Sequence, residues 1–182
     1  VTVGGGDDGM SAVDWVLRAY EHDPEIPLAA VVVCGPFMPP AMQRQFRERA
    51  ERLGRIAVVT FDTHVELLME RAAGVVAMGG YNTFCEILSL DKRAILIPRV
   101  KPRREQLLRA NRAAALGLVH TLDPEGIHDP AAMAAALRGL SRQPLPSQHG
   151  AGQMLDGLDV ITDLVAAHVG GARRRRVQAV GT

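Results

Sequence analysis

The strongest chemical signal in the sequence is a pair of glycines between an apolar run and a helical pattern. The apolar run ends at Gly79 and Gly80, and a helical pattern begins at Asn82 or Thr83. Glycine lets the backbone approach a ligand, and a helix start presents free N–H groups, so this turn suits a phosphate. Glu86, about one turn later, could accept hydrogen bonds from two neighbouring hydroxyls, as on a ribose. The spacing fits equally well an ordinary turn in which Asn82 or Thr83 caps the helix and Glu86 completes a capping box.

A second glycine turn lies near the amino terminus. Gly4-Gly5-Gly6-Asp7-Asp8-Gly9 matches the G-x-G-x-x-G dinucleotide fingerprint. The next predicted strand ends at residues 34–36 without the acid that would hold a ribose, and two carboxylates would repel a pyrophosphate in the loop. The pattern therefore argues against a nicotinamide cofactor, and Asp7 or Asp8 is also a candidate N-cap of the following helix.

The third candidate is the cationic segment from Pro98 to Gln106. It follows a predicted strand directly and contains Arg99, Lys101, Arg103 and Arg104. Arginines at the carboxyl end of a strand could neutralise a diphosphate bound at the glycine turns. A solvated loop before a helix explains the same residues, and the sequence leaves both interpretations open.

These segments need a scaffold, and the hydrophobic pattern supplies one. Short apolar runs alternate with amphipathic stretches and short connections, which predicts a doubly wound, Rossmann-like α/β domain with about six parallel strands. Both glycine turns fall at carboxyl ends of strands, so they could line one crevice. The strands are expected at residues 1–3, 28–34, 56–60, 74–78, 94–97 and 118–121. The later helices are expected at 41–53, 65–72, 102–116, 130–140 and 150–167.

Composition narrows the class of protein. The chain has 182 residues, is 47% hydrophobic and carries a formal net charge of +1. Because Arg173 to Arg176 supply four positive charges, the rest is slightly acidic, which argues against a nucleic-acid partner. The six histidines are scattered without metal-ligand spacing, so no metal is expected; His64, near the end of the third strand, is the one candidate for the site.

Residues 1–169 are expected to form one domain, and residues 170–182 a flexible basic tail. Arg173 to Arg176 could contact anionic lipid, although a solubilising tail is the favoured interpretation. The chain lacks an initiator Met and begins inside a strand pattern, so it looks like part of a longer polypeptide.

Three segments together resemble a known family. They are Gly80-Tyr81-Asn82-Thr83-Phe84-Cys85-Glu86, Ile95-Leu96-Ile97-Pro98 and Arg104-Glu105-Gln106. Their types and separations are similar to the carboxy-terminal donor-binding domain of family 28 glycosyltransferases, one half of a GT-B fold. The family's best-known member transfers N-acetylglucosamine to the lipid-linked peptidoglycan precursor. Residues 35–39 and 78–83 make the chain more similar to a group of predicted glycosyltransferases.

The resemblance implies roles for particular residues. Glu86 would hold the ribose hydroxyls of a nucleotide sugar, Phe61 would lie beside the uracil, and Gln106 would contact the sugar. Backbone N–H groups of both glycine turns and the Thr83 hydroxyl would contact the diphosphate. The implied donor-binding set is Gly5, Gly6, Phe61, Gly79, Gly80, Tyr81, Asn82, Thr83, Glu86, Arg104 and Gln106. The chain departs from the family at Gly6-Asp7-Asp8, where a Ser or Thr is usual, and at Asp91-Lys92-Arg93, where Gly-Lys-Pro is usual.

The function implied is transfer of a sugar from a UDP-linked nucleotide sugar, with UDP-N-acetylglucosamine as the candidate donor, to an unknown acceptor. The acceptor and the general base would come from an amino-terminal domain that this chain lacks, so its catalytic residues are unknown and the fragment alone is expected to be inactive. No cofactor is expected, and the location expected is cytoplasmic, with possible contact at the inner face of the membrane. A nucleotide-sugar 2-epimerase and a non-catalytic nucleotide-sugar-binding domain are the alternatives.

Overall fold

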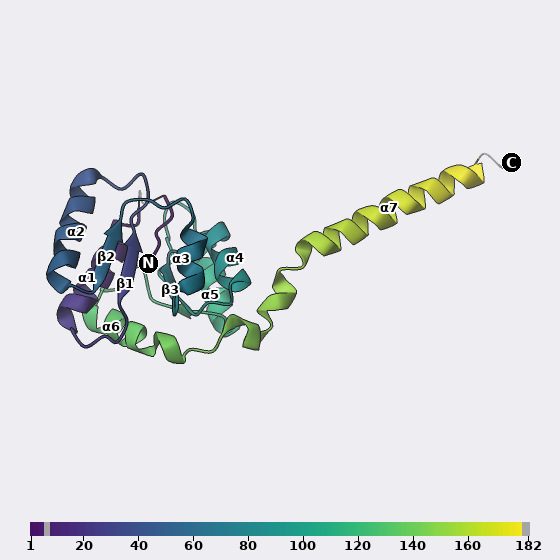
Figure 1. The fold of residues 1–182 in the computed structure, drawn as a ribbon. Helices are drawn as coiled ribbons and strands as arrows, with labels where there is room; N and C mark the ends of the chain where they lie inside the picture. Colours follow the sequence, from purple (N-terminus) through teal and green to yellow (C-terminus); the bar gives the residue numbers. More distant parts are fainter. Residues whose placement is uncertain (6–7, 180–182) are drawn as a thin grey trace.

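The chain folds into a three-layer α/β body followed by a long helix (Figure 1). The computed structural model describes residues 1–5 and 8–179, with side chains except those of residue 153 and residues 169–179. The strands are β1 (Ala30–Val33), β2 (Ile56–Val59), β3 (Val75–Ala77), β4 (Ala94–Leu96) and β5 (His120–Thr121). The helices are α1 (Met10–His22), α2 (Pro40–Leu53), α3 (Val65–Arg71), α4 (Tyr81–Ser89), α5 (Glu105–Ala115), α6 (Pro130–Gly139) and α7 (Gly157–Ala179). Three 3-10 helices, Leu140–Arg142, Pro146–His149 and Ala151–Met154, connect α6 to α7.

The sheet is parallel, and its order reverses at the amino-terminal segment. β1 pairs with β2, and β4 pairs with both β3 and β5. Thr2 joins the two halves through parallel bridges to Val33 of β1 and Ala77 of β3. The spatial order is therefore β2, β1, Thr2, β3, β4, β5, which is the doubly wound order, with its switch point between Thr2 and β3. This confirms the predicted fold class.

Alternating side chains of the sheet face two separate cores. Val76 and Ile95 pack into the core beneath α1, α2 and α6, whereas Val75 and Leu96 pack into the core beneath α3, α4 and α5. This division follows from the period of two along a strand, and it explains why the central strands are apolar on both faces. Figure 1 shows the two helix groups on either side of the sheet.

Local chemistry fixes several helix ends. Pro40 occupies the first turn of α2, and Gly54 ends this helix in the left-handed conformation, with φ of 65°. The Asp129 carboxylate caps α6 by accepting a hydrogen bond of 3.0 Å from the N–H of Ala131.

The strand count differs from the prediction. The structure has five strands within the described residues instead of about six, because the segment 1–3 contributes only the bridges of Thr2 before the glycine turn begins. The predicted last helix over 150–167 is instead a 3-10 helix followed by α7, which continues to Ala179. Residues 180–182 of the predicted tail lie outside the described residues, and the flexibility of that tail stays a prediction.

Candidate functional site

A cleft of about 220 Å³ lies at the switch point of the sheet. It opens where the first glycine turn leaves Thr2 and the second leaves β3, so both turns contribute to one wall, as the sequence predicts. The lining residues are Thr2, Val3, Gly4, Gly5, Asp8, Met78, Gly79, Gly80, Thr83, Arg99 and Gln106. Five of the predicted donor-binding residues are therefore brought together: Gly5, Gly79, Gly80, Thr83 and Gln106.

The first turn is held against the loop that follows β1. The Phe37 N–H donates a hydrogen bond of 2.9 Å to the Gly5 carbonyl. Gly35 has φ of +86°, and a Cβ there would lie 2.3 Å from the Gly4 carbonyl oxygen. Only glycine permits this close packing of two backbones, so the loop after β1 fixes the shape of the first turn.

The second turn depends on Gly79 and on a cation from α5. Gly79 is buried, has φ of +75°, and a Cβ there would lie 3.2 Å from Leu96 Cδ1. The Arg109 guanidinium donates a hydrogen bond of 2.8 Å to the Gly79 carbonyl and lies 5.6 Å from the centre of the Tyr81 ring. Arg109 therefore positions this turn from behind, a role that the sequence did not suggest.

Helix α4 begins directly at the cleft. Its N-cap is Gly80 and its first residue is Tyr81, so the predicted start at Asn82 or Thr83, and their role as caps, is wrong. No side chain caps α4, because Gly80 has none to offer, and Gly80 and Thr83 at the start of this helix line the cleft. This arrangement suits an anion.

Glu86 follows Thr83 by three residues, which places the two side chains on the same side of α4. Glu86 is half-buried, and its carboxylate has no hydrogen-bond or ion-pair partner among the described residues. Thr83 lines the cleft, whereas Glu86 lies one helical turn further away and does not line it. The capping box considered for Glu86 is absent.

One arginine of the cationic segment reaches the cleft, and it is Arg99. Its Nη1 donates to Asp8 Oδ2 at 2.6 Å, its Nη2 lies 3.8 Å from Glu105 Oε1, and its backbone N–H donates to Gln106 Oε1 at 3.1 Å. The hydrogen bond that Arg99 donates to Asp8 raises the pKa of Arg99, so the guanidinium stays charged. Asp8 is not the N-cap of α1, which is Gly9, because its carboxylate pairs with Arg99 instead.

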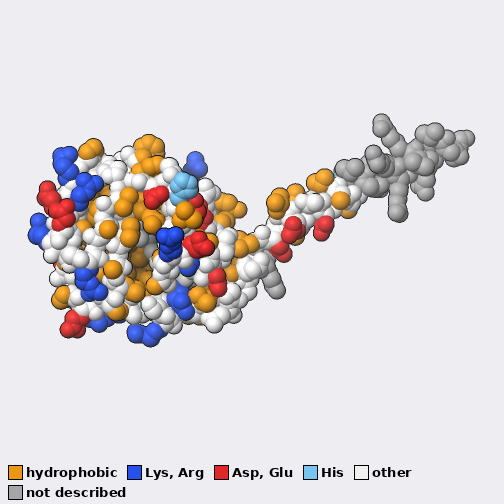
Figure 2. All heavy atoms as spheres, in the orientation of Figure 1, with side chains coloured by type: hydrophobic (Ala, Val, Ile, Leu, Met, Phe, Trp, Pro, Cys, Tyr) orange, Lys and Arg blue, Asp and Glu red, His pale blue; other side chains and the backbone are white. Residues whose placement is uncertain are grey.

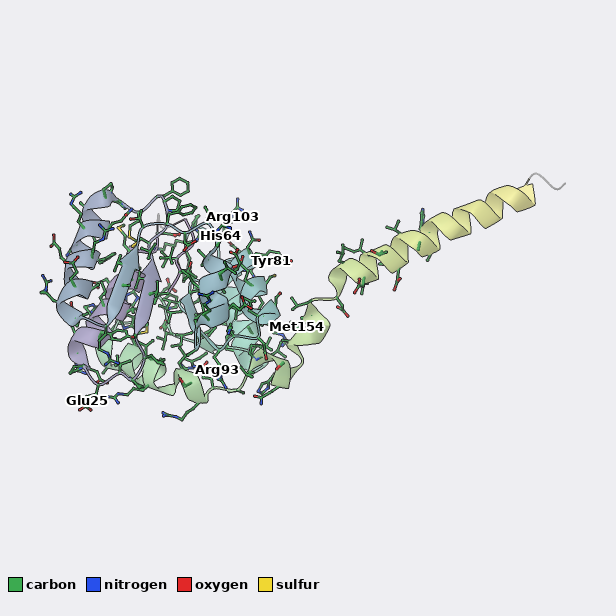
Figure 3. The ribbon with its side chains drawn as sticks, in the orientation of Figure 1. Glu25, His64, Tyr81, Arg93, Arg103 and Met154 are labelled. Carbon is green, nitrogen blue, oxygen red and sulfur yellow. The ribbon has the colours of Figure 1, made fainter. Side chains whose placement is uncertain are left out.

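The remaining predicted residues lie outside the lining of the cleft. Phe61 and Tyr81 are 52% and 68% exposed, and Asn82 and Arg104 are also exposed. Gly6 and Asp7 fall outside the described residues. His64 caps α3 only through its backbone and is exposed. In Figure 3, His64, Tyr81 and Arg103 lie at one end of the body, and Glu25 and Arg93 lie toward the other.

A larger cavity of about 340 Å³ lies beneath α3, against β1 and β3. Its walls are mostly aliphatic, with Val31, Leu68 and Val75 among them, and it contains neither glycine turn nor Arg99. The smaller cleft is the better match for an anionic ligand, because both glycine turns, the start of α4 and Arg99 line it.

Two further features are absent from the part of the chain that the structure describes. No cluster of three or more His, Cys, Asp or Glu side chains suited to a metal ion occurs among them. None of the described helices combines the length and the apolar character that crossing a membrane requires.

Comparison with known proteins adds the family context. Residues 1–144 match the model of the glycosyltransferase family 28 C-terminal domain. A comparison with curated proteins gave no match. The family match spans all five strands and helices α1 to α6 of the described residues, including every residue that lines the cleft.

Solved glycosyltransferases share the fold. Glycosyltransferase VinC, in complex with DTDP, matches at a TM-score of 0.60 and 19% identity, over 95% of this chain and 41% of that one. The calicheamicin glycosyltransferase CalG4 matches at 0.54 and 18%, over 91% and 43%. The glycosyltransferase of kitacinnamycin matches at 0.53 and 16%, over 88% and 42%. The chain thus spans about two-fifths of the length of these structures.

Proposed function

We propose that this chain, which belongs to the glycosyltransferase family 28 C-terminal domains, binds the nucleotide-sugar donor of a two-domain glycosyltransferase. The observation that carries the proposal is the cleft at the switch point, where two glycine turns, the start of α4, Thr83, Arg99 and Gln106 meet. Backbone N–H groups and one guanidinium suit the diphosphate that every nucleoside-diphosphate sugar contains.

The donor would lie across the cleft with its diphosphate at the glycine turns. Thr83 would donate its hydroxyl to a phosphate oxygen, and Gln106 would contact the sugar. Glu86, one turn along α4, would grip the ribose with the carboxylate that has no partner among the described residues. Phe61, exposed beyond β2, would lie beside the base.

The reaction we infer is direct displacement at the anomeric carbon. An acceptor hydroxyl attacks that carbon while the bond to the diphosphate oxygen breaks, and the configuration inverts. The free N–H groups of α4 and the Arg99 guanidinium would stabilise the negative charge that grows on the departing oxygen. The general base and the acceptor site would belong to an amino-terminal half, since the chain spans only 41% of its neighbour VinC.

The nucleotide is tested by direct binding. The resemblance favours UDP-N-acetylglucosamine, and DTDP, the ligand of the VinC complex, is the natural second candidate. Calorimetric titration of the 182-residue chain with UDP-N-acetylglucosamine, UDP and DTDP is expected to give binding in the micromolar to millimolar range.

Glu86→Ala is expected to weaken this binding roughly ten- to hundredfold, because a charged acceptor of two hydroxyl hydrogen bonds is lost. Glu25→Ala is the matched control, because that carboxylate is 86% exposed and lies at the far end of the body (Figure 3). Absence of binding to all three ligands at millimolar concentration would contradict the proposed function.

A further inference from the structure

An ion pair crosses the cleft at the position proposed for the diphosphate. Asp8 lies in the first glycine turn, Arg99 follows β4, and both line the cleft together with Gly79 and Gly80. A carboxylate in this place is unexpected for a phosphate site, because it would repel a bound anion at close range.

Arg99 is held in place by more than Asp8. Its backbone N–H is fixed to Gln106 Oε1, and its Nη2 lies 3.8 Å from Glu105. Its Nε atom is buried and has no hydrogen-bond partner among the described residues. The backbone of Arg99 is therefore fixed at the cleft, and its guanidinium keeps one donor that the described protein groups do not use.

Asp8 has no comparable anchor. Among the described residues its carboxylate contacts Arg99 alone, and its side chain is 41% exposed. Of the two partners, Asp8 is the one that can leave the ion pair at the smaller cost.

We propose that the Asp8 carboxylate competes with the diphosphate of the donor for the Arg99 guanidinium. When the donor binds, its diphosphate displaces Asp8 from this ion pair. This inference rests on the proposed function, and it assigns the phosphate-binding role to Arg99 rather than to Arg104. Asp8 is then a specificity-determining residue, because it sets how strongly the cleft favours each nucleotide according to its charge.

Asp8 affects binding of the reaction product more than binding of the substrate. When the bond between the anomeric carbon and the diphosphate oxygen breaks, that oxygen becomes part of a terminal phosphate, and the nucleoside diphosphate carries more negative charge than the nucleotide sugar did. Asp8 opposes this product more than it opposes the substrate. It therefore favours release of the nucleoside diphosphate after transfer.

The test is a double-mutant cycle read by calorimetry. Asp8→Asn, Arg99→Gln and the double variant are titrated with UDP, UMP and UDP-N-acetylglucosamine, with circular dichroism melts to check folding. Asp8→Asn is expected to tighten UDP binding roughly fivefold to tenfold, with a smaller gain for UDP-N-acetylglucosamine and for UMP. Arg99→Gln is expected to weaken UDP binding about tenfold or more.

The gain from Asp8→Asn is expected to shrink in the Arg99→Gln background, because the two side chains act through one contact. Asp159→Asn, an exposed carboxylate on α7, controls for the change in net charge. If the wild-type chain binds UDP but Asp8→Asn leaves that affinity unchanged or lowers it, the inference is wrong and the proposed function stands. If the wild-type chain binds none of these nucleotides, nor DTDP, both are wrong.

Discussion

A hydrogen bond to the backbone orients the Gln106 side chain, and so determines which end of its amide is free to contact a ligand. Its Oε1 accepts the Arg99 N–H at 3.1 Å, so the amide is oriented with Nε2 as the free end, and Gln106 lines the cleft. An amide fixed in this way presents the two N–H donors of Nε2 at its free end. These N–H donors suit the oxygens of a sugar or a phosphate.

We therefore expect Gln106→Glu to weaken binding of UDP-N-acetylglucosamine by at least about tenfold. The carboxylate can still accept the Arg99 N–H, but it removes the donors and adds a negative charge beside the diphosphate. The melting temperature should stay near that of the wild type, and calorimetry with a thermal melt measures both.

Gln148→Glu is the matched control for this substitution. The Gln148 Oε1 also accepts a backbone N–H, from Leu145 at 2.9 Å, and it lies outside the lining of the cleft. Equal affinity of Gln106→Glu and the wild type would mean that the amide does not face the donor.

The positions of single residues beside the cleft were predictable from the sequence where backbone rules apply, and not where a loop decides. Their roles in donor binding stay a prediction. Gly79, Gly80 and Thr83 were identifiable because a strand, a glycine turn and a helix must follow one another in that order. Arg99 could not be separated from Arg104, since the loop 98–104 has no periodicity that would tell which side chain turns inward. The Asp8–Arg99 pair joins residues 91 positions apart, which local spacing does not reveal.

At the scale of the element, the two glycines of the second turn are required for different reasons. Gly79 has φ of +75°, whereas Gly80 has φ of −54°, and a Cβ on Gly80 would have no atom within 4 Å. The first glycine is needed to form the turn. The second is needed only if a ligand comes close to the backbone.

Gly79→Ala is therefore expected to lower the free energy of unfolding by about 1–2 kcal/mol, because an L-residue is strained at positive φ. Gly80→Ala is expected to keep or slightly raise the melting temperature, and to weaken UDP binding because its methyl group occupies space beside the diphosphate. Thermal melts and calorimetry on the pair measure the two effects.

Two results would contradict this division of roles. Wild-type stability of Gly79→Ala would show that the left-handed conformation is not required. Wild-type UDP affinity of Gly80→Ala would show that the ligand does not approach this part of the backbone.

The order of elements was predictable, but several boundaries were not. Apolar runs such as residues 28–34 and 94–97 predict strands buried on both faces, and β1 and β4 form there. β4 is buried throughout, whereas the prediction of full burial is wrong for β1, in which Val31 is 40% exposed. Helix α4 begins one or two residues earlier than expected, at Tyr81, because Gly80 itself serves as N-cap. The segment 1–3 reduces to the bridges of Thr2, although its place at the centre of the sheet is the one a first strand would occupy.

The whole molecule divides into a body that contains the cleft and a helix that leaves it. Helix α7 projects from the body in Figure 1, and Figure 2 shows apolar and acidic side chains exposed on its near part. Leu158, Ile161 and Leu164 are 76%, 59% and 65% exposed. In contrast, Ala151 in the preceding 3-10 helix is buried in the core beneath α3, α4 and α5. The family match, which ends at residue 144, falls within the body.

Because the exposed side chains of α7 bury little apolar surface, they contribute little to the stability of the body. A chain ending at Asp156 is therefore expected to melt within about 2 °C of the full chain, and to bind UDP with the same affinity. A chain ending at Gln148 is the informative contrast, since it also loses Ala151 from the core and should melt at a clearly lower temperature.

If the chain ending at Asp156 melts well below the full chain, α7 stabilises the body through contacts other than those of the described side chains. If it keeps its melting temperature and loses UDP binding, α7 contributes to the donor site, and the cleft at the switch point is not the whole of it.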